Sequence, residues 1–170
     1  MKEYYGIPFR ATIYTKLRSF QFKVNHNIIF TNDRLYKIGY VSSDLCTFCN
    51  EYSETLCHLF VECHKIKELW SQVTQTLLSP YGIEQLSEKD ILLGIICREN
   101  QNNVINHILI EVKYYIYMCK LEKTMPVYNR LKNRLKITES IEKEIAQKTM
   151  KKAKQHTYKW HHIMEYLLDT

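Results

Sequence analysis

Three cysteines and one histidine in the first half of the chain have the residue types and the spacing of a metal site. Cys46 and Cys49 are separated by two residues, and His58 and Cys63 complete the pattern C-x2-C-x8-H-x4-C. All four are side chains that bind Zn²⁺ in closed tetrahedral sites. Four protein ligands leave no position for a reacting water. The spacing therefore predicts one structural zinc ion that fixes the fold and does no chemistry.

Other cysteines and histidines allow alternatives to this ligand set. Cys57 is the main competitor because it neighbours His58, and two buried thiols beside an unrelated histidine would leave no site at all. Cys97 and Cys119 end the apolar segments LLGIIC and YYIYMC, which favours a role as small core residues. Five further histidines have no clustered partners, and solvated or core roles are favoured for them over metal binding: His64, His107, His156, His161 and His162.

Helix geometry restricts how His58 and Cys63 can share one ion. Residues five apart on an α-helix point about 140° away from each other. We therefore predict a break or distortion near Cys63. A short first helix would carry His58 and end at Cys63, and residues 65–78 would form a second helix.

Apolar periodicity predicts further helices on both sides of this segment. One begins at Thr15 and is marked by Leu17, Phe20, Val24 and Ile28. The segment TNDRLYKIG predicts a short helix with Thr31 or Asn32 as its N-cap and Gly39 just past its end. Ser53 is predicted to cap the helix that carries His58.

The second half of the chain has a helical pattern with a basic face. Pro80, Tyr81 and Gly82 predict a boundary, which divides the chain into a zinc-binding domain (1–79) and a helical C-terminal tail (80–170). We predict a short helix over 88–96 and a polar loop at 99–103. An amphipathic helix marked by Ile105 to Cys119 should end before Pro126. Residues 128–168 have a further helical pattern. The fold class is mostly α: a small helical module with a CCHC zinc knuckle followed by a helical tail.

Charge and composition narrow the function classes. The formal net charge is +6, and residues 120–159 contain twelve Lys or Arg against four Glu, so the rest of the chain is close to neutral. An anionic partner, RNA or DNA, is favoured. The candidate phosphate contacts, each of which could instead be a solvated lysine or arginine on a helix, are Arg10, Lys16, Arg18, Lys23, Lys148, Lys151, Lys152 and Lys154.

Other features argue against an enzyme, a secreted protein or a membrane protein. The four aspartates form no Asp-Asp pair for two-metal catalysis, and no glycine-rich phosphate loop is present. The start MKEYYGIPFR has no secretory pattern, so we expect a reducing intracellular compartment where clustered cysteines bind metal. No apolar run is long enough to span a membrane. We expect no membrane association and no small-molecule substrate.

The segment from Lys16 to Trp70 resembles the zinc-binding region that follows the polymerase in LINE-type (non-LTR) retrotransposon reverse transcriptases. The likeness lies in the helix around residues 20–25, the TNDRLYKIG helix, the C-x2-C knuckle, and the E-T-x2-H-L-F-x2-C segment. The later stretch HILIEVKYYIYMCKLEKTMPVYNRLKNRLK is similar to the helical tails of such elements. One departure is His64, where a proline often follows the last ligand.

This resemblance implies that Cys46, Cys49, His58 and Cys63 bind zinc and that the module grips element RNA or target DNA during reverse transcription. It implies no catalytic role for the segment. It also implies that the protein is located in the nucleus or the cytoplasm. The chain would be a C-terminal piece separated from its enzyme, or a domesticated or decayed copy. The alternative function is a structural module that docks onto a reverse transcriptase core through an apolar patch with Phe20, Tyr36 and Trp70.

Overall fold

The computed structural model of the protein describes residues 2–96 and 101–168, and these residues are mostly α with no strand. The single extended pairing among them is an antiparallel bridge between Leu45 and Ser53. The predicted fold class is confirmed. The helical elements are α1 (Lys2–Ala11), α2 (Thr15–Asn25), α3 (Asn32–Lys37), η1 (His58–Glu62), α4 (His64–Val73), η2 (Thr74–Leu78), η3 (Ser79–Tyr81), α5 (Glu88–Leu93), α6 (Gln101–Glu122), α7 (Tyr128–Ala146) and α8 (Met150–Leu168).

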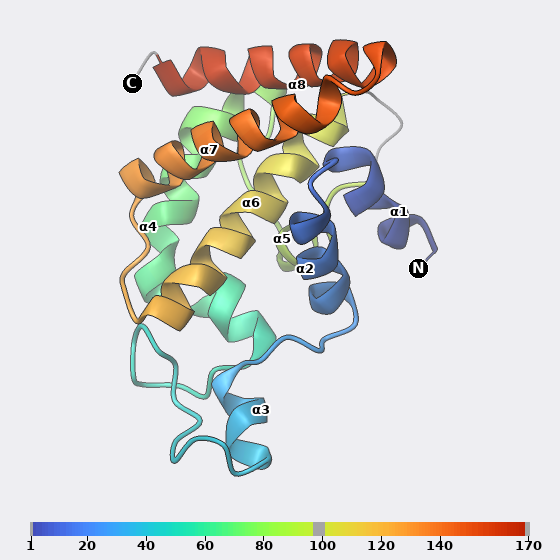
Figure 1. Ribbon diagram of the computed structural model, residues 1–170. Coiled ribbons are helices and arrows are strands. Elements are labelled where there is room, and N and C mark those ends of the chain that lie inside the picture. Colours follow the sequence, from blue (N-terminus) through green and yellow to red (C-terminus); the bar gives the residue numbers. More distant parts are fainter. Residues whose placement is uncertain (1, 97–100, 169–170) are drawn as a thin grey trace.

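Helix α6 runs through the middle of the fold, and α1, α2, α7 and α8 pack against it (Figure 1). Every residue from Val104 to Ile116 is buried, so the predicted one-faced amphipathic helix is wrong for this stretch. A helix that is covered on all sides lies in the core and not at the surface. None of the described helices combines the length and apolar composition needed to cross a membrane.

The polar residues of α6 are buried together with its apolar ones, so they need partners inside the protein. Asn106 bonds to both the N–H and the carbonyl oxygen of Ile95, at 2.7 and 2.9 Å. Glu111 accepts from Arg134 at 3.2 Å. Lys113, which is fully buried, donates to the carbonyl oxygen of Leu92 at 2.8 Å. These bonds tie the central helix to α5 and α7.

The N-terminal elements differ from the sequence pattern in two places. Helix α1 was not predicted, and it contains Pro8, a residue that disfavours helix interiors. The second helix ends at Asn25, because Asn27 takes a left-handed conformation with φ 50°. Ile28 is therefore exposed and Ile29 supplies the buried side chain.

Other predicted boundaries are confirmed or shifted by a few residues. Helix α3 follows Thr31 at the N-cap and ends before Gly39, which has φ 72°. Helix α5 ends at Leu93 and not at residue 96, because Gly94 has φ 93° and a Cβ there would lie 2.5 Å from the amide oxygen of Asn106. The start of α6 at Gln101 makes residues 101–103 helical where a loop was predicted. Residues 99 and 100 of that loop lie outside the described residues.

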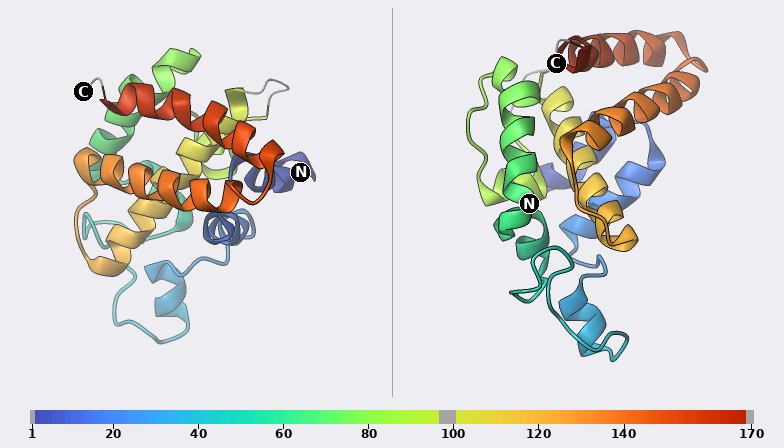
Figure 2. Two further views of the ribbon diagram at one scale, coloured as in Figure 1. Left: turned by 45° about the horizontal axis from the view of Figure 1, so that its top comes forward. Right: turned by 90° about the vertical axis from the view of Figure 1, so that its left-hand side faces the viewer.

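The basic tail consists of two helices, α7 and α8, which lie side by side (Figures 1 and 2). One stripe of each is buried, through Leu131 and Leu135 of α7 and Trp160 and Ile163 of α8. In both figures α8 and α3 lie at opposite ends of the molecule. One apolar cluster joins residues from before and after the predicted boundary at 79/80, and the division into two domains stays a prediction.

Candidate metal centre

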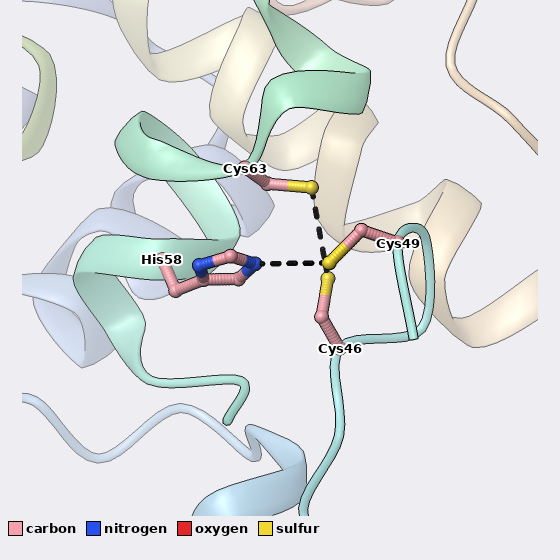
Figure 3. A group of neighbouring side chains, drawn as sticks. All are labelled: Cys46, Cys49, His58 and Cys63. Atoms are coloured by element: carbon pink, nitrogen blue, oxygen red, sulfur yellow. Dashed lines mark hydrogen bonds between the residues drawn. The ribbon is translucent and has the colours of Figure 1, made fainter. Parts of the chain in front are cut away.

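The side chains of Cys46, Cys49, His58 and Cys63 converge on one point (Figure 3). Their ligand atoms all lie within 4.8 Å of one another. A tetrahedral zinc ion with bonds of about 2.3 Å to sulfur and about 2.0 Å to nitrogen places its ligand atoms roughly 3.5–3.8 Å apart. The Cys46 and Cys63 sulfurs are 3.8 Å apart, and the Cys49 sulfur is 3.4 Å from Nε2 of His58. The residues present therefore fit one zinc ion.

A tight turn after the short bridge presents the first two sulfurs. The N–H of Cys46 bonds to the carbonyl oxygen of Tyr52 at 2.8 Å, and the N–H of Asn50 returns to the carbonyl oxygen of Cys46 at 2.9 Å. Asn50 has φ 55°, which closes the turn. The N–H of Phe48 points at the Cys46 sulfur at 3.4 Å. The turn thus supplies both sulfur ligands and a backbone donor for a thiolate.

A π-helical turn solves the geometric conflict between His58 and Cys63. In η1 the N–H of Cys63 bonds to the carbonyl oxygen of His58 at 3.0 Å, a five-residue step that brings the two residues onto the same side of the backbone. Cys63 then leaves helical geometry with ψ 120° before α4 begins. The predicted distortion near Cys63 is confirmed, and it forms without a proline at position 64.

Two side chains outside the ligand set stabilise this turn. The indole N–H of Trp70 donates to the carbonyl oxygen of Phe60 at 2.8 Å, inside η1. The N–H of His58 bonds to the hydroxyl of Thr55 at 3.0 Å. Thr55, and not the predicted Ser53, therefore accepts from one of the free N–H groups at the start of this helical segment, while Ser53 pairs with Leu45 in the bridge.

Burial and backbone donors set different pKa values for the three thiols. Burial raises the pKa of Cys46 to about 12, and it also raises the pKa of Cys63. Burial acts in the same direction on Cys49, but the N–H groups of Glu51 and Tyr52, with His58, lower its pKa to about 7. In the absence of a cation, Cys46 and Cys63 thus hold their protons at neutral pH. Zinc has to displace these protons when it binds.

Glu54 is a buried carboxylate beside the knuckle, and the sequence pattern assigned no role to it. It accepts from the N–H of Thr47 at 2.7 Å and from the N–H of Asn32 at 3.0 Å. The ammonium of Lys120 lies 3.1 Å from it, and both side chains are almost completely buried. Glu54 therefore joins the knuckle, α3 and the end of α6. The sequence feature that could have pointed to Glu54 is its position at the start of the E-T-x2-H segment.

The competing cysteines and histidines lie elsewhere. Among the described residues, the group of close ligand atoms does not include Cys57, whose pKa burial and the neighbouring carboxyl groups raise to about 12. Cys119 is buried in the core as predicted. His107 is fully buried, and burial and Lys159 lower its pKa to about 3. Cys97 and the side chain of His162 lie outside the described residues.

Three of the eight cationic residues proposed for nucleic acid lie together, at one cavity. Arg10 of α1 lies near α8, where Lys152 and Lys154 line the same cavity. Arg18 is half-buried and donates to the carbonyl oxygen of Thr12 at 2.6 Å, so its guanidinium is already engaged. The side chain of Lys151 lies outside the described residues. The other exposed members are Lys16, Lys23 and Lys148.

Residues 2–70 match the family model for zinc-binding in reverse transcriptase. The matched range contains all four converging side chains and the elements from α1 to most of α4. No curated protein and no solved structure matches the chain. Residues 2–70 are thus similar to a zinc-binding domain associated with reverse transcriptases.

Proposed function

We propose that the chain is a non-catalytic, zinc-stabilised module that binds RNA or target DNA, derived from the C-terminal part of a non-LTR retrotransposon reverse transcriptase. The family match supports the zinc-binding part of this proposal. The resemblance of residues 16–70 to LINE-type elements supports the finer origin. One Zn²⁺ would be held by Cys46, Cys49, His58 and Cys63, in a reducing compartment where thiols persist.

The nucleic-acid role is supported by exposed Lys and Arg side chains that form no ion pair with a carboxylate among the described residues. Of the eight predicted cations, six are exposed in the described part of the chain: Arg10, Lys16, Lys23, Lys148, Lys152 and Lys154. None of the six has a carboxylate within ion-pair distance among the described residues. Unpaired surface cations attract phosphates and release counterions when they bind them.

Zinc would support this role indirectly. The four ligands come from the loop after α3, from η1 and from Cys63 directly after η1, so one ion joins two segments of the chain. A closed site of three cysteines and one histidine stabilises the fold and leaves no position for substrate. The chain would then bind nucleic acid through its helices and not through the ion.

The experiment that tests the proposal measures zinc content and then binding to labelled single-stranded RNA and DNA at two salt concentrations. One zinc per chain with binding that weakens steeply at higher salt is the expected result. A protein that contains zinc but binds neither strand at low salt would refute the nucleic-acid role. A protein without zinc would refute the proposal at its first step.

Exposed apolar side chains around α3 favour a second candidate, a module that docks onto a reverse transcriptase core. Phe30, Tyr36, Ile38 and Tyr40 are all more than half exposed, and contiguous exposed apolar residues are typical of protein interfaces. The patch predicted from sequence was partly wrong, because Phe20 and Trp70 are buried. Binding through such a surface would not weaken as salt rises.

A further inference from the structure

A cavity of about 620 Å³ lies between the C-terminal end of α1 and the first half of α8. Its size falls within the range of about 300–1,000 Å³ that is typical of ligand pockets. Segments from both ends of the chain line it, since residues 9–13 face residues 152–159. In Figure 1 the beginning of α8 passes above α1 at the same side of the molecule. The cavity lies outside the metal centre, and none of the zinc-ligand candidates lines it.

The wall of this cavity is positive. Arg10, Lys152 and Lys154 line it and are exposed. Glu142 is the single carboxylate among the described lining residues, and it already accepts hydrogen bonds from the ammonium of Lys159 and, at 2.8 Å, from the indole N–H of Trp160. The negative charge at the base is therefore neutralised inside the protein, while the three cations at the rim face solvent.

An aromatic ring stands beside these cations. Phe9 lines the cavity and is 65% exposed, so part of its ring is open to a ligand from solvent. The Arg18 guanidinium lies over this ring, 5.4 Å from its centroid, in a cation–π contact. Proteins bind single-stranded nucleic acid with cationic side chains along its phosphate backbone and aromatic side chains that stack on its bases. A duplex keeps its bases stacked inside and offers none to Phe9.

We infer that this cavity, between α1 and α8, binds single-stranded nucleic acid, with Arg10, Lys152 and Lys154 on successive phosphates and Phe9 against an unpaired base. The inference rests on the proposed function. It adds the location of the nucleic-acid site and the preference of that site for single strands. It also predicts that the two ends of the chain act together. Arg10 lies within the zinc-binding family match, whereas Lys152 and Lys154 lie in the tail.

The test compares two triple variants that remove equal charge. The cavity variant removes the three cations at the rim of the cavity through Arg10→Gln, Lys152→Gln and Lys154→Gln. The matched control replaces three other lysines with Gln, Lys65, Lys136 and Lys143, which are exposed and do not line the cavity. Binding of a labelled 12-nucleotide single strand is measured by fluorescence anisotropy over a salt series, with zinc content and circular dichroism as checks of folding.

We expect the cavity variant to bind at least tenfold more weakly than the wild type, and the control to change less than threefold. The slope of log K against log salt should fall by about 2 in the cavity variant, since each phosphate contact on a single strand contributes about 0.7. Equal losses in both variants would overturn the cavity as the site while leaving the proposed function intact. No binding by the wild-type protein would refute both.

Two further arms test the chemistry of the ligand. Phe9→Ala should weaken single-strand binding about tenfold, and Phe9→Tyr, which keeps a ring, should restore it. A blunt duplex that competes as well as the single strand would overturn the strand preference. A free nucleoside triphosphate that displaces the strand at equal concentration would identify a mononucleotide pocket and overturn the assignment to a strand.

Discussion

The protonation of the three cysteine ligands determines how the metal centre responds to pH. Cys46, whose pKa burial raises to about 12, and Cys63, whose pKa is also raised, hold protons at pH 7, whereas Cys49 has a pKa of about 7. Zinc binds thiolates, so each of these protons competes with the ion. We expect the apparent zinc affinity to rise by about three decades per pH unit near pH 6, where Cys49 is also protonated, and by about two decades per pH unit near pH 8. Competition with a chromophoric chelator measures it, and a flat profile would contradict thiolate ligation.

Single cysteine replacements separate ligands from neighbours. Cys49→Ser removes one of four ligands, so we expect less than one zinc per chain and loss of the turn that Cys46 and Asn50 close. Cys57→Ser is the matched control, because Cys57 adjoins His58 but lies outside the ligand group. Atomic absorption and circular dichroism report both effects. If Cys57→Ser loses zinc and Cys49→Ser keeps it, the ligand assignment is wrong.

At the scale of elements, Glu54 connects the knuckle to α3 and α6. Glu54→Gln removes the charge that the buried ammonium of Lys120 faces at 3.1 Å. Breaking a buried pair from one side costs about 3 kcal/mol, because the remaining charge is uncompensated. We expect the free energy of unfolding to fall by this amount and zinc to dissociate faster. Urea denaturation and chelator-driven release measure the two effects.

The control for this element is Glu51→Gln. Glu51 is exposed near the same knuckle, and the one ion pair of its carboxylate among the described residues is with His64, at 3.8 Å. Exposed pairs contribute little to stability. Its unfolding free energy should stay within about 0.5 kcal/mol of the wild type. Equal effects of the two replacements would show that Glu54 stabilises no more than an ordinary surface carboxylate.

Local signals in the sequence predicted the elements that depend on neighbouring residues. The C-x2-C spacing, the cap at Thr31 and the break at Cys63 all follow from residues a few positions apart. Contacts between residues that lie far apart in the sequence could not be predicted from such local signals. The core position of Lys113 and the bond from Glu54 to Lys120 depend on which helices meet. Helix α1 was missed because Pro8 argues against it locally, while its packing on α6 stabilises it.

Across the whole molecule, one buried carboxylate joins the N-terminal segment to the tail. Glu142 of α7 accepts from the hydroxyl of Thr12, from the N–H of Ile13 at 3.0 Å, and from Lys159 and Trp160 of α8. The ammonium of Lys159 also donates to the carbonyl oxygen of Ala11 at 3.1 Å. These bonds form the base of the cavity between α1 and α8, so the geometry of that cavity depends on Glu142.

Replacing this carboxylate should therefore affect stability in a pH-dependent way. Burial opposes ionisation of Glu142, but His107, Lys159 and the hydrogen bonds outweigh it and lower its pKa from 4.5 to about 2. A lowered carboxyl pKa stabilises the fold above pH 4.5, and this contribution is lost as pH falls from about 4.5 to 2. Glu142→Gln should cost about 3 kcal/mol at pH 7 and flatten the unfolding free energy across that acid window.

Urea denaturation from pH 7 to pH 2 distinguishes this effect from a general loss of charge. The control is Glu144→Gln, which removes an exposed carboxylate from the same helix and should change the unfolding free energy by less than about 0.5 kcal/mol. His107, whose lowered pKa of about 3 destabilises the fold as pH falls below 6.5, remains in both variants. Acid sensitivity that starts near pH 6.5 should therefore persist in both. A Glu142→Gln protein with the wild-type profile below pH 4.5 would show that Glu142 does not supply the acid-dependent part of the stability.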